Sequence, residues 1–250
     1  MSERKAKDTV DFSVEGGVAW VKFNRPEKRN AQSPSLNRRM LEVLDELEFR
    51  DDVGVLVLSG EGAAWTAGMD LKEYFRESAA NGLAGVRKSQ REAFTWWRRL
   101  RWYQKPTIAM VNGWCFGGAY GPLFACDLAF CADDAQFGLS EINWGILPGG
   151  GATKVVTSLM GFRDAMYHEV GERLLKKNPV ALKATKDSVR RVVEMTYENA
   201  EDYLIRAQEA ADSFDPEGRT EGMKQFLDDK SYKPGLGAYD LSKQKPKKRA

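Results

Sequence analysis

The stretch TIAMVNGWCFGG, Thr107 to Gly118, carries the features that decide the fold. Its first five residues form a short apolar run, which is typical of a buried strand, and Asn112-Gly113 then ends the run. Two further glycines close the stretch. The run VGVLVL, Val53 to Leu58, has the same character and also leads into a glycine turn. The sequence therefore predicts short strands that are buried on both faces, as in a parallel sheet.

Strands and helices alternate through the first half of the chain. Val18 to Phe23 is expected to be a strand, and Ser33-Pro34 then supplies a helix N-cap followed by proline at the first helical position. This alternation predicts a parallel-type α/β core, whereas the chain is helical from about Pro179 onward. The other expected elements are a buried strand at Leu128–Ala132, a short strand starting at Phe137-Gly138, and helices at Gly85–Tyr103, Val180–Val193, Glu198–Phe214 and Glu217–Leu227.

The composition indicates an ordinary soluble globule of 250 residues, with 42% hydrophobic and 30% charged residues. The net charge of +2 comes from the tail Lys243 to Arg249, whose five basic residues are expected to be a solvated, disordered end. Nothing else indicates a nucleic-acid-binding face. The N-terminus has no apolar leader segment and no run of about 18 apolar residues occurs, so we expect a cytoplasmic protein without a membrane partner.

Cysteine and histidine exclude several kinds of site. Cys115, Cys126 and Cys131 are odd in number and lack CxxC spacing, so we expect reduced, buried thiols. His168 is the only histidine, which excludes a Ser-His-Asp triad, a Cys-His pair and a histidine-rich metal site. We expect His168 to be structural and no metal to be bound.

Two glycine-rich stretches share a context that suits catalysis. Ala67-Gly68-Met69-Asp70 and Gly117-Gly118 each follow a buried strand and open toward a helix, which leaves backbone N–H groups free. Two such groups that converge form an oxyanion hole, and glycine permits the close approach. Ordinary strand–helix turns are the alternative interpretation of each stretch. Neither stretch matches a nucleotide-binding loop, nor does Gly149–Gly151.

Glu141 lies in the largely apolar run FGLSEINWGILPGGG, Phe137 to Gly151. Burial near Trp144 and Ile146 would raise the pKa of its carboxyl toward neutrality, which suits a general acid/base. A hydrogen-bonded structural glutamate is the alternative. Because no histidine is available for catalysis, one glutamate is the natural proton carrier. Two oxyanion donors together with Glu141 favour chemistry alpha to a thioester or similar carbonyl, in which the oxyanion hole holds the enolate and Glu141 transfers protons.

Three blocks of sequence occur in an order that resembles the enoyl-CoA hydratase/isomerase (crotonase) superfamily. They are VKFNRPEKRNAQS, AAWTAGMDLKE, and VNGWCFGGAYGPLFACDLAFCADDAQFGLSEINWGILPGGGATK. The resemblance covers most of Val10 to Gly235, and TAGMDLKEYFRE and GMKQFLDDKSYKPGL resemble the hydroxycinnamoyl-CoA (feruloyl-CoA) hydratase-lyase branch. It implies an α/β fold, a crotonase-like spiral of repeated ββα units, with C-terminal helices used for trimerisation in a homotrimer or hexamer.

The resemblance also implies a division of the chain and a set of site residues. The core would span 1–178, the C-terminal helical region 179–235 and the basic tail 236–250. The amides of Met69 and Gly118 would form the oxyanion hole and Glu141 would be the acid/base. The substrate would contact Tyr74, Gly121, Trp144 and Tyr203, and coenzyme A would contact Arg25, Lys28, Ala31, Ala67 and Lys230.

The implied activity is hydration of feruloyl-, 4-coumaroyl- or caffeoyl-CoA, followed by retro-aldol cleavage to an aromatic aldehyde and acetyl-CoA. No cofactor is expected beyond the coenzyme A of the substrate. Two alternatives stay open. The first is an enoyl-CoA hydratase, or another acyl-CoA enzyme of the family, without lyase activity. The second is a catalytically inactive relative that acts as a binding or scaffold protein.

Three departures from the family pattern motivate these alternatives. Ala119 to Pro122 lacks the second glutamate of ordinary hydratases, which is consistent with the lyase branch, but Gly121 stands where that branch carries a serine. Ile205 stands where the branch carries another tyrosine. His168 to Gly171 joins two segments that relatives separate by a helix–strand–helix unit. Either the chain has a true deletion, or residues are missing from the sequence, and we favour the second interpretation.

Overall fold

A computed structural model covers all 250 residues and describes residues 9–170 and 178–230. Contacts divide the chain into two compact units, 1–137 and 138–250, which are described separately below. The contacts group residues 138–170 with the C-terminal helices, and the expected functional division at residue 178 stays a prediction. The predicted tail 236–250 lies outside the described residues.

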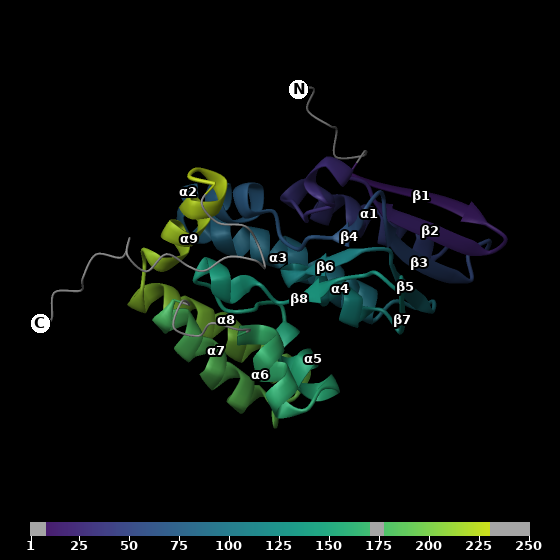
Figure 1. The fold of residues 1–250 in the computed structure, drawn as a ribbon. Coiled ribbons are helices and arrows are strands. Elements are labelled where there is room, and N and C mark those ends of the chain that lie inside the picture. Colours follow the sequence, from purple (N-terminus) through teal and green to yellow (C-terminus); the bar gives the residue numbers. More distant parts are fainter. Residues whose placement is uncertain (1–8, 171–177, 231–250) are drawn as a thin grey trace, which may run out of the picture. The chain divides into compact units, whose positions relative to one another are not determined.

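The first unit is built on a five-stranded sheet with the order β1-β2-β3-β5-β7 (Figure 1). The strands β2, β3, β5 and β7 are parallel, as predicted, whereas β1 pairs with β2 in antiparallel register. Leu56, Val57 and Leu58 are consecutive and all buried, which confirms a strand covered on both faces. The bounds are β1 (Val10–Glu15), β2 (Val18–Phe23), β3 (Val55–Gly60), β5 (Thr107–Val111) and β7 (Leu128–Cys131).

The predicted burial of the strand at Leu128–Ala132 is wrong. The strand exists as β7, but it is the edge of the sheet, and Leu128 and Phe130 are 54% and 61% exposed. An apolar run does not distinguish an edge strand, which has one neighbour, from a central strand, which has two. Cys131 is exposed for the same reason, whereas Cys115 is buried as expected.

Two long helices carry the apolar core of the first unit. Helix α1 (Pro34–Glu48) starts where Ser33 was predicted to cap it, since the Ser33 hydroxyl accepts a hydrogen bond from the Leu36 N–H at 3.2 Å. Helix α1 packs against α3 (Gly82–Arg101), which starts three residues before the predicted Gly85. Trp96 of α3 is fully buried and meets Phe23 of β2 edge to face. The shorter helices are η2 (Pro26–Lys28), the π-helical η3 (Leu71–Arg76), α2 (Glu77–Ala80), η4 (Gly117–Ala119) and α4 (Tyr120–Ala125).

A small sheet, ordered β4-β6-β8, positions the two glycine-rich stretches. Strands β4 (Ala64–Thr66) and β6 (Trp114–Phe116) are parallel, with an irregularity between Ala64 and Thr66. Because parallel strands end at the same edge of a sheet, the segments that follow β4 and β6 emerge side by side. The third strand, β8 (Phe137–Gly138), contains the boundary between the units.

The second unit is helical, as predicted for most of its length. Asn178 caps α7 by accepting hydrogen bonds from Val180 N–H and Ala181 N–H, both at 2.9 Å. Its apolar cluster of Leu147, Val192, Ala200 and Leu204 binds the loop after η5 to α7 and α8. The elements are η5 (Glu141–Trp144), α5 (Ala152–Leu159), α6 (Phe162–Val170), α7 (Pro179–Val192), α8 (Tyr197–Phe214) and α9 (Gly218–Leu227).

Candidate active site

The segments after β4 and β6 lie in direct contact within the first unit. Gly68 has a φ of +83°, and a Cβ placed there would lie 2.8 Å from Gly118 N and closer still to Phe116 O. Only glycine tolerates both this backbone conformation and this approach. The structure therefore brings the two predicted glycine stretches together, and backbone contact holds them.

Two backbone amides are available at this contact. A Cβ built on Gly118 would lie 3.3 Å from the amide nitrogen of Met69, so the two residues are close neighbours. Within the part of the chain that the structure describes, the Met69 N–H has no hydrogen-bond acceptor. Gly118 is the second residue of η4, where a helix start leaves N–H groups without an intrahelical partner. Such a pair of donors can stabilise an oxyanion.

Glu141 begins η5 in the second unit and is only 8% exposed. Burial raises the pKa of its carboxyl to about 7, although backbone hydrogen bonds at Glu141 and Ser140 oppose part of this shift. Its Oε2 is buried and has no hydrogen-bond partner among the described residues. The buried Glu48 of the first unit also has one oxygen, Oε1, without a partner among the described residues, but its Oε2 is paired with Arg99. Glu141 thus has the properties of an acid/base that works near neutral pH.

Close packing between η5 and α9 positions the segment that carries Glu141. A Cβ on Gly222 would lie 2.7 Å from the carbonyl oxygen of Trp144, so α9 approaches the backbone of η5 directly. The Trp144 ring lies edge to face against Phe226, with 4.9 Å between centroids. Trp144, a predicted substrate contact, is therefore buried against α9.

The two predicted substrate tyrosines lie in different environments. Tyr74 is buried in η3 of the first unit, five residues after Met69, and its ring lies edge to face against Phe75 at 4.9 Å. Tyr203 is half-buried on α8 of the second unit and packs against the apolar cluster that contains Leu147 and Leu204. Ile205 is half-buried on the same helix. Of these residues, Tyr74 lies nearest in sequence to the oxyanion donors.

Gly121 packs against Trp97. A Cβ on Gly121 would lie 2.5 Å from two atoms of the Trp97 indole. The indole therefore occupies the space that a side chain at 121 would need. This contact gives a physical reason for glycine at the position where the resemblance implied serine. Gly121 is in α4, three residues after the proposed donor Gly118.

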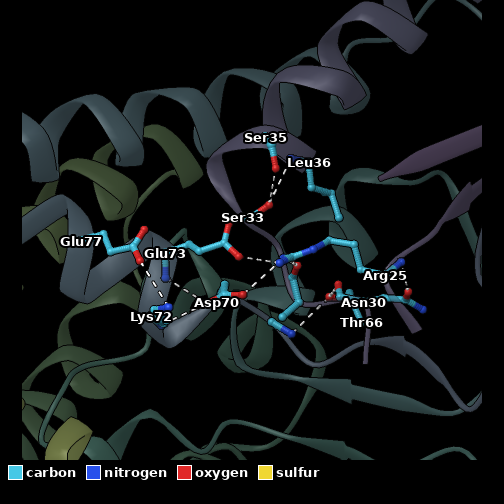
Figure 2. Close-up of polar contacts among 12 residues, drawn as sticks. Arg25, Asn30, Ser33, Ser35, Leu36, Thr66, Asp70, Lys72, Glu73 and Glu77 are labelled. Atoms are coloured by element: carbon cyan, nitrogen blue, oxygen red, sulfur yellow. Dashed lines mark hydrogen bonds and ion pairs between the residues drawn. The ribbon is translucent and has the colours of Figure 1, made fainter. Parts of the chain in front are cut away.

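Arg25 has a role that the sequence did not predict (Figure 2). Its side chain is 8% exposed, and its guanidinium donates to Asp70 Oδ2 at 3.3 Å and Glu73 Oε1 at 2.6 Å. It also donates to the carbonyl oxygen of Ala31 at 2.6 Å. The guanidinium of Arg25 therefore binds two carboxylates and one carbonyl of the protein itself, and these bonds compete with any contact to a phosphate.

Asp70 connects Arg25 to the start of η3, as Figure 2 shows. Its Oδ1 accepts hydrogen bonds from Lys72 N–H at 3.0 Å and Glu73 N–H at 2.9 Å, which caps the helix that carries Tyr74. Asp70 directly follows Met69. Sequence reasoning missed this function of Asp70, although aspartate before LKEYF is an N-cap signal that could have revealed it.

The other predicted coenzyme A contacts lie in three places: the turn before α1, the segment after β4 and the end of α9. Lys28 is exposed, and its carbonyl accepts from the Ala31 N–H at 3.0 Å. Ala67 is half-buried and donates its N–H to Arg29 O at 2.9 Å. Lys230 follows α9 in the second unit, with its ammonium 5.9 Å from the Phe226 ring centroid. Of the two basic residues predicted to contact coenzyme A in the first unit, Arg25 is buried and Lys28 is exposed to solvent.

Within residues 9–170 and 178–230, no group of three or more histidine, cysteine, aspartate or glutamate side chains is arranged to hold a metal ion. In those ranges no helix is both long and apolar enough to span a membrane.

Comparison with known families places this arrangement in a class of enzymes that act on coenzyme A thioesters. The family model for enoyl-CoA hydratase/isomerase matches residues 13–169. The match covers more than half of the chain and includes both glycine stretches and Glu141. The chain belongs to the enoyl-CoA hydratase/isomerase family.

Among characterised relatives, the hydroxycinnamoyl-CoA hydratase-lyase of Pseudomonas fluorescens is 51% identical over 265 residues, covering 92% of this chain and 96% of the relative. The 4-chlorobenzoyl coenzyme A dehalogenase-2 of an Arthrobacter species is 38% identical over 64% of this chain and 58% of its own length. The branch resemblance deduced from the sequence is therefore confirmed.

Solved structures confirm the crotonase-like α/β fold. An enoyl-CoA hydratase from Rhodobacter sphaeroides 2.4.1 superposes with a TM-score of 0.75 at 17% identity, and 95% of each chain is covered. At this identity the similarity concerns the fold alone.

The comparison also bears on the short junction at His168 to Gly171. The alignment with the Pseudomonas fluorescens relative is longer than the 250 residues of this chain, so that relative contains residues that this chain lacks. Both interpretations, a true deletion and residues missing from the sequence, therefore stay predictions, and an intact-mass measurement of the protein tests them. Residues 171–177 lie outside the described ranges.

Proposed function

We propose that this chain is a hydroxycinnamoyl-CoA hydratase-lyase. The observation that carries the proposal is the 51% identity to the Pseudomonas fluorescens enzyme across 92% of the chain. The substrates would be feruloyl-, 4-coumaroyl- or caffeoyl-CoA. The products would be acetyl-CoA and the corresponding aromatic aldehyde, which is vanillin for feruloyl-CoA.

The first unit supplies the donors that stabilise negative charge. In our proposal the amides of Met69 and Gly118 donate hydrogen bonds to the thioester oxygen. This oxygen becomes an enolate oxygen when water adds to the β-carbon, so the donors bind the transition state more strongly than the substrate. The close approach of the two residues, which Gly68 permits, supports this role.

The second unit supplies the proton carrier. In the hydration step Glu141, ionised, accepts a proton from water as the oxygen bonds to the β-carbon, and a proton is then delivered to the α-carbon. Its pKa of about 7 permits both directions of transfer near neutral pH. The buried, unpartnered Oε2 supports this role because a carboxyl held in an ion pair would remain ionised.

Cleavage uses the same two devices. Loss of the β-hydroxyl proton forms the aldehyde carbonyl while the bond between the α- and β-carbons breaks. The electron pair of that bond passes to the thioester, again as an enolate, and protonation of the α-carbon gives acetyl-CoA. Both steps need charge stabilisation and proton transfer, which amides and one carboxyl provide, so we propose no metal or redox cofactor.

We further propose that coenzyme A is bound through Lys28, Ala31, Ala67 and Lys230, and the phenolic end of the substrate near Tyr74. Arg25 belongs to the same region, where it supports the turn that contains Ala31. A homotrimer or a dimer of trimers in the cytoplasm completes the proposal. The exposed Leu128 and Phe130 of β7 are apolar surface that such an assembly could cover, and sedimentation velocity measures its size.

Product analysis with feruloyl-CoA tests the function directly. Equal amounts of vanillin and acetyl-CoA support a hydratase-lyase. Accumulation of the β-hydroxy thioester alone would instead show a hydratase without lyase activity. This is the second candidate function, and the match to the enoyl-CoA hydratase/isomerase family supports it. No turnover of feruloyl-CoA, 4-coumaroyl-CoA or crotonyl-CoA would contradict both.

A further inference from the structure

We infer that Gln32 is a positioning residue for the oxyanion hole, fixing Met69 through its backbone and Gly118 through its side-chain amide. The inference rests on the donor role proposed above for these two amides. Gln32 precedes α1 and has no exposed surface. It takes no part in proton transfer and acts only through the residues it holds.

The backbone of Gln32 brackets Met69. The Gln32 N–H donates to Gly68 O at 2.7 Å, and Gln32 O accepts from Asp70 N–H at 3.0 Å. These two bonds form a parallel bridge between Gln32 and Met69. They hold the peptide groups on both sides of Met69, while the Met69 N–H has no acceptor within residues 9–170 and 178–230.

The side chain of Gln32 reaches the second donor residue. Its Nε2 donates to the carbonyl oxygen of Gly118 at 3.2 Å. Glycine has the widest conformational freedom of any residue, so Gly118 needs an external contact to keep its backbone in one orientation. The Gln32 amide provides that contact across 86 residues of sequence.

The orientation of the Gln32 amide is itself determined by Trp97. Its Oε1 accepts from the indole N–H of Trp97 at 3.2 Å, so the amide must present Nε2 to Gly118. Trp97 is held in turn by Gly121, whose missing side chain leaves room for the indole. A chain of contacts therefore extends from α3 through Gln32 to both proposed donors.

The test is the variant Gln32→Met, which keeps the size of the side chain and the backbone bridge but removes both side-chain hydrogen bonds. We expect kcat for the acyl-CoA substrate to fall about tenfold, because a small misplacement of catalytic groups is costly. We expect KM to change less than about threefold, since ground-state binding is mostly remote from the thioester oxygen.

A matched control is available in the same core. The indole N–H of Trp96 donates to Asn37 Oδ1 at 2.8 Å, which is another buried indole–amide bond between α3 and the α1 region. Asn37→Leu leaves an indole N–H unpaired, as Gln32→Met does, but it touches neither donor residue. Both variants should lose thermal stability, whereas only Gln32→Met should lower kcat.

A spectroscopic readout separates positioning from stability. The absorption of bound 4-dimethylaminocinnamoyl-CoA shifts to longer wavelength when donors polarise its thioester carbonyl. We expect the wild type and Asn37→Leu to give the same red shift, and Gln32→Met to give about half of it, because polarisation depends on how the donors are placed. This measurement requires binding but no turnover.

The outcomes distinguish this inference from the proposed function. If Gln32→Met matches Asn37→Leu in kcat and red shift, the positioning role is wrong and the function stands. If the wild type gives no red shift, the oxyanion role of Met69 and Gly118 is wrong. Should Gln32→Met fail to fold, Gln32→Glu replaces it. Measured at a pH where the new carboxyl is ionised, that variant keeps the acceptor for Trp97 and removes the donor to Gly118, and it should lower kcat and the red shift at least as much.

Discussion

The two units treat their functional groups in opposite ways. Around Met69 in the first unit, the neighbouring polar groups are paired: Asp70 with Arg25, and the Gln32 amide with Gly118 and Trp97. In the second unit, Glu141 is buried and one of its carboxyl oxygens has no partner among the described residues. Backbone donors need fixed surroundings to remain aimed, whereas an acid/base needs a site that does not commit it to one protonation state.

The largest expected effect concerns Glu141 and activity. Glu141→Gln keeps the shape of the side chain but cannot exchange protons, so we expect kcat to fall by about 10³. Turnover of feruloyl-CoA and stopped-assay product analysis measure the loss. Wild-type activity should rise with pH through an apparent pKa near 7, if the ionised form accepts the proton from water. Unchanged turnover with every acyl-CoA tested would remove Glu141 from the mechanism.

The next effect concerns the stability of the paired network in the first unit. Arg25→Gln leaves the buried Asp70 without its cation, so we expect the free energy of unfolding to fall by roughly 3 kcal/mol. Chemical denaturation measures this change. Lys28→Ala, in an exposed residue of the same turn, should leave stability unchanged and raise KM for the acyl-CoA a few-fold. If Arg25→Gln raises KM without loss of stability, Arg25 contacts the acyl-CoA directly and the structural role is wrong.

In the second unit, the buried charge of Glu141 is expected to lower stability by about as much as the Arg25–Asp70 pair raises it in the first unit. The pKa of Glu141 is raised from 4.5 to about 7, so folding favours the protonated carboxyl. Below pH 4.5 the carboxyl is protonated in both states and costs nothing. Between pH 4.5 and 7 stability falls as pH rises, and above pH 7 the full cost is about 3 kcal/mol.

Glu141→Gln has no such titration, so it should be more stable than the wild type at pH 8, and the difference should shrink at pH 5. Urea denaturation at the two pH values provides the measurement. Equal stability of the two proteins at pH 8 would show that Glu141 is hydrated or paired in the native state, contrary to its burial.

The smallest expected effect tests the approach of the two donors. A Cβ on Gly118 would lie 2.7 Å from Met69 Cγ, so Gly118→Ala must displace a flexible side chain beside the Met69 amide. We expect kcat to fall about 30-fold, less than the full loss of an oxyanion donor, with little change in melting temperature. Gly149→Ala is a suitable control, because a Cβ there meets no atom within 4 Å. Equal kcat values for the two variants would argue against the donor role of Gly118.

Much of this arrangement could be predicted from local sequence. The context of Gly68 and Gly118, each between a strand and a helix, predicted available amides, and the apolar neighbours of Glu141 predicted its raised pKa. Helix α1 begins at its predicted cap, Ser33, and α7 begins at Pro179, one residue before the predicted start. Each of these features depends on side chains only a few positions apart.

The remainder depends on strand order and distant contacts, which residue spacing does not encode. The ion pairs of Arg25 could not be predicted, because its carboxylate partners Asp70 and Glu73 lie more than 40 residues away in sequence. Strand β7 read as buried because its position at the sheet edge follows from topology rather than composition. Strand β1 was missed because only alternate residues face the core. The proposed role of Gln32 could not be predicted from sequence, because it depends on contacts of the side-chain amide with the distant Gly118 and Trp97.

The contact between Trp97 and Gly121 ties the identities of two distant positions to each other. A hydroxyl cannot be introduced at 121 while the full indole occupies 97, so a Gly121→Ser substitution alone would force the large ring aside and disturb the amide that it orients. A hydroxyl at 121 therefore requires a smaller residue at 97, so that α4 gains polarity only as α3 gives up bulk.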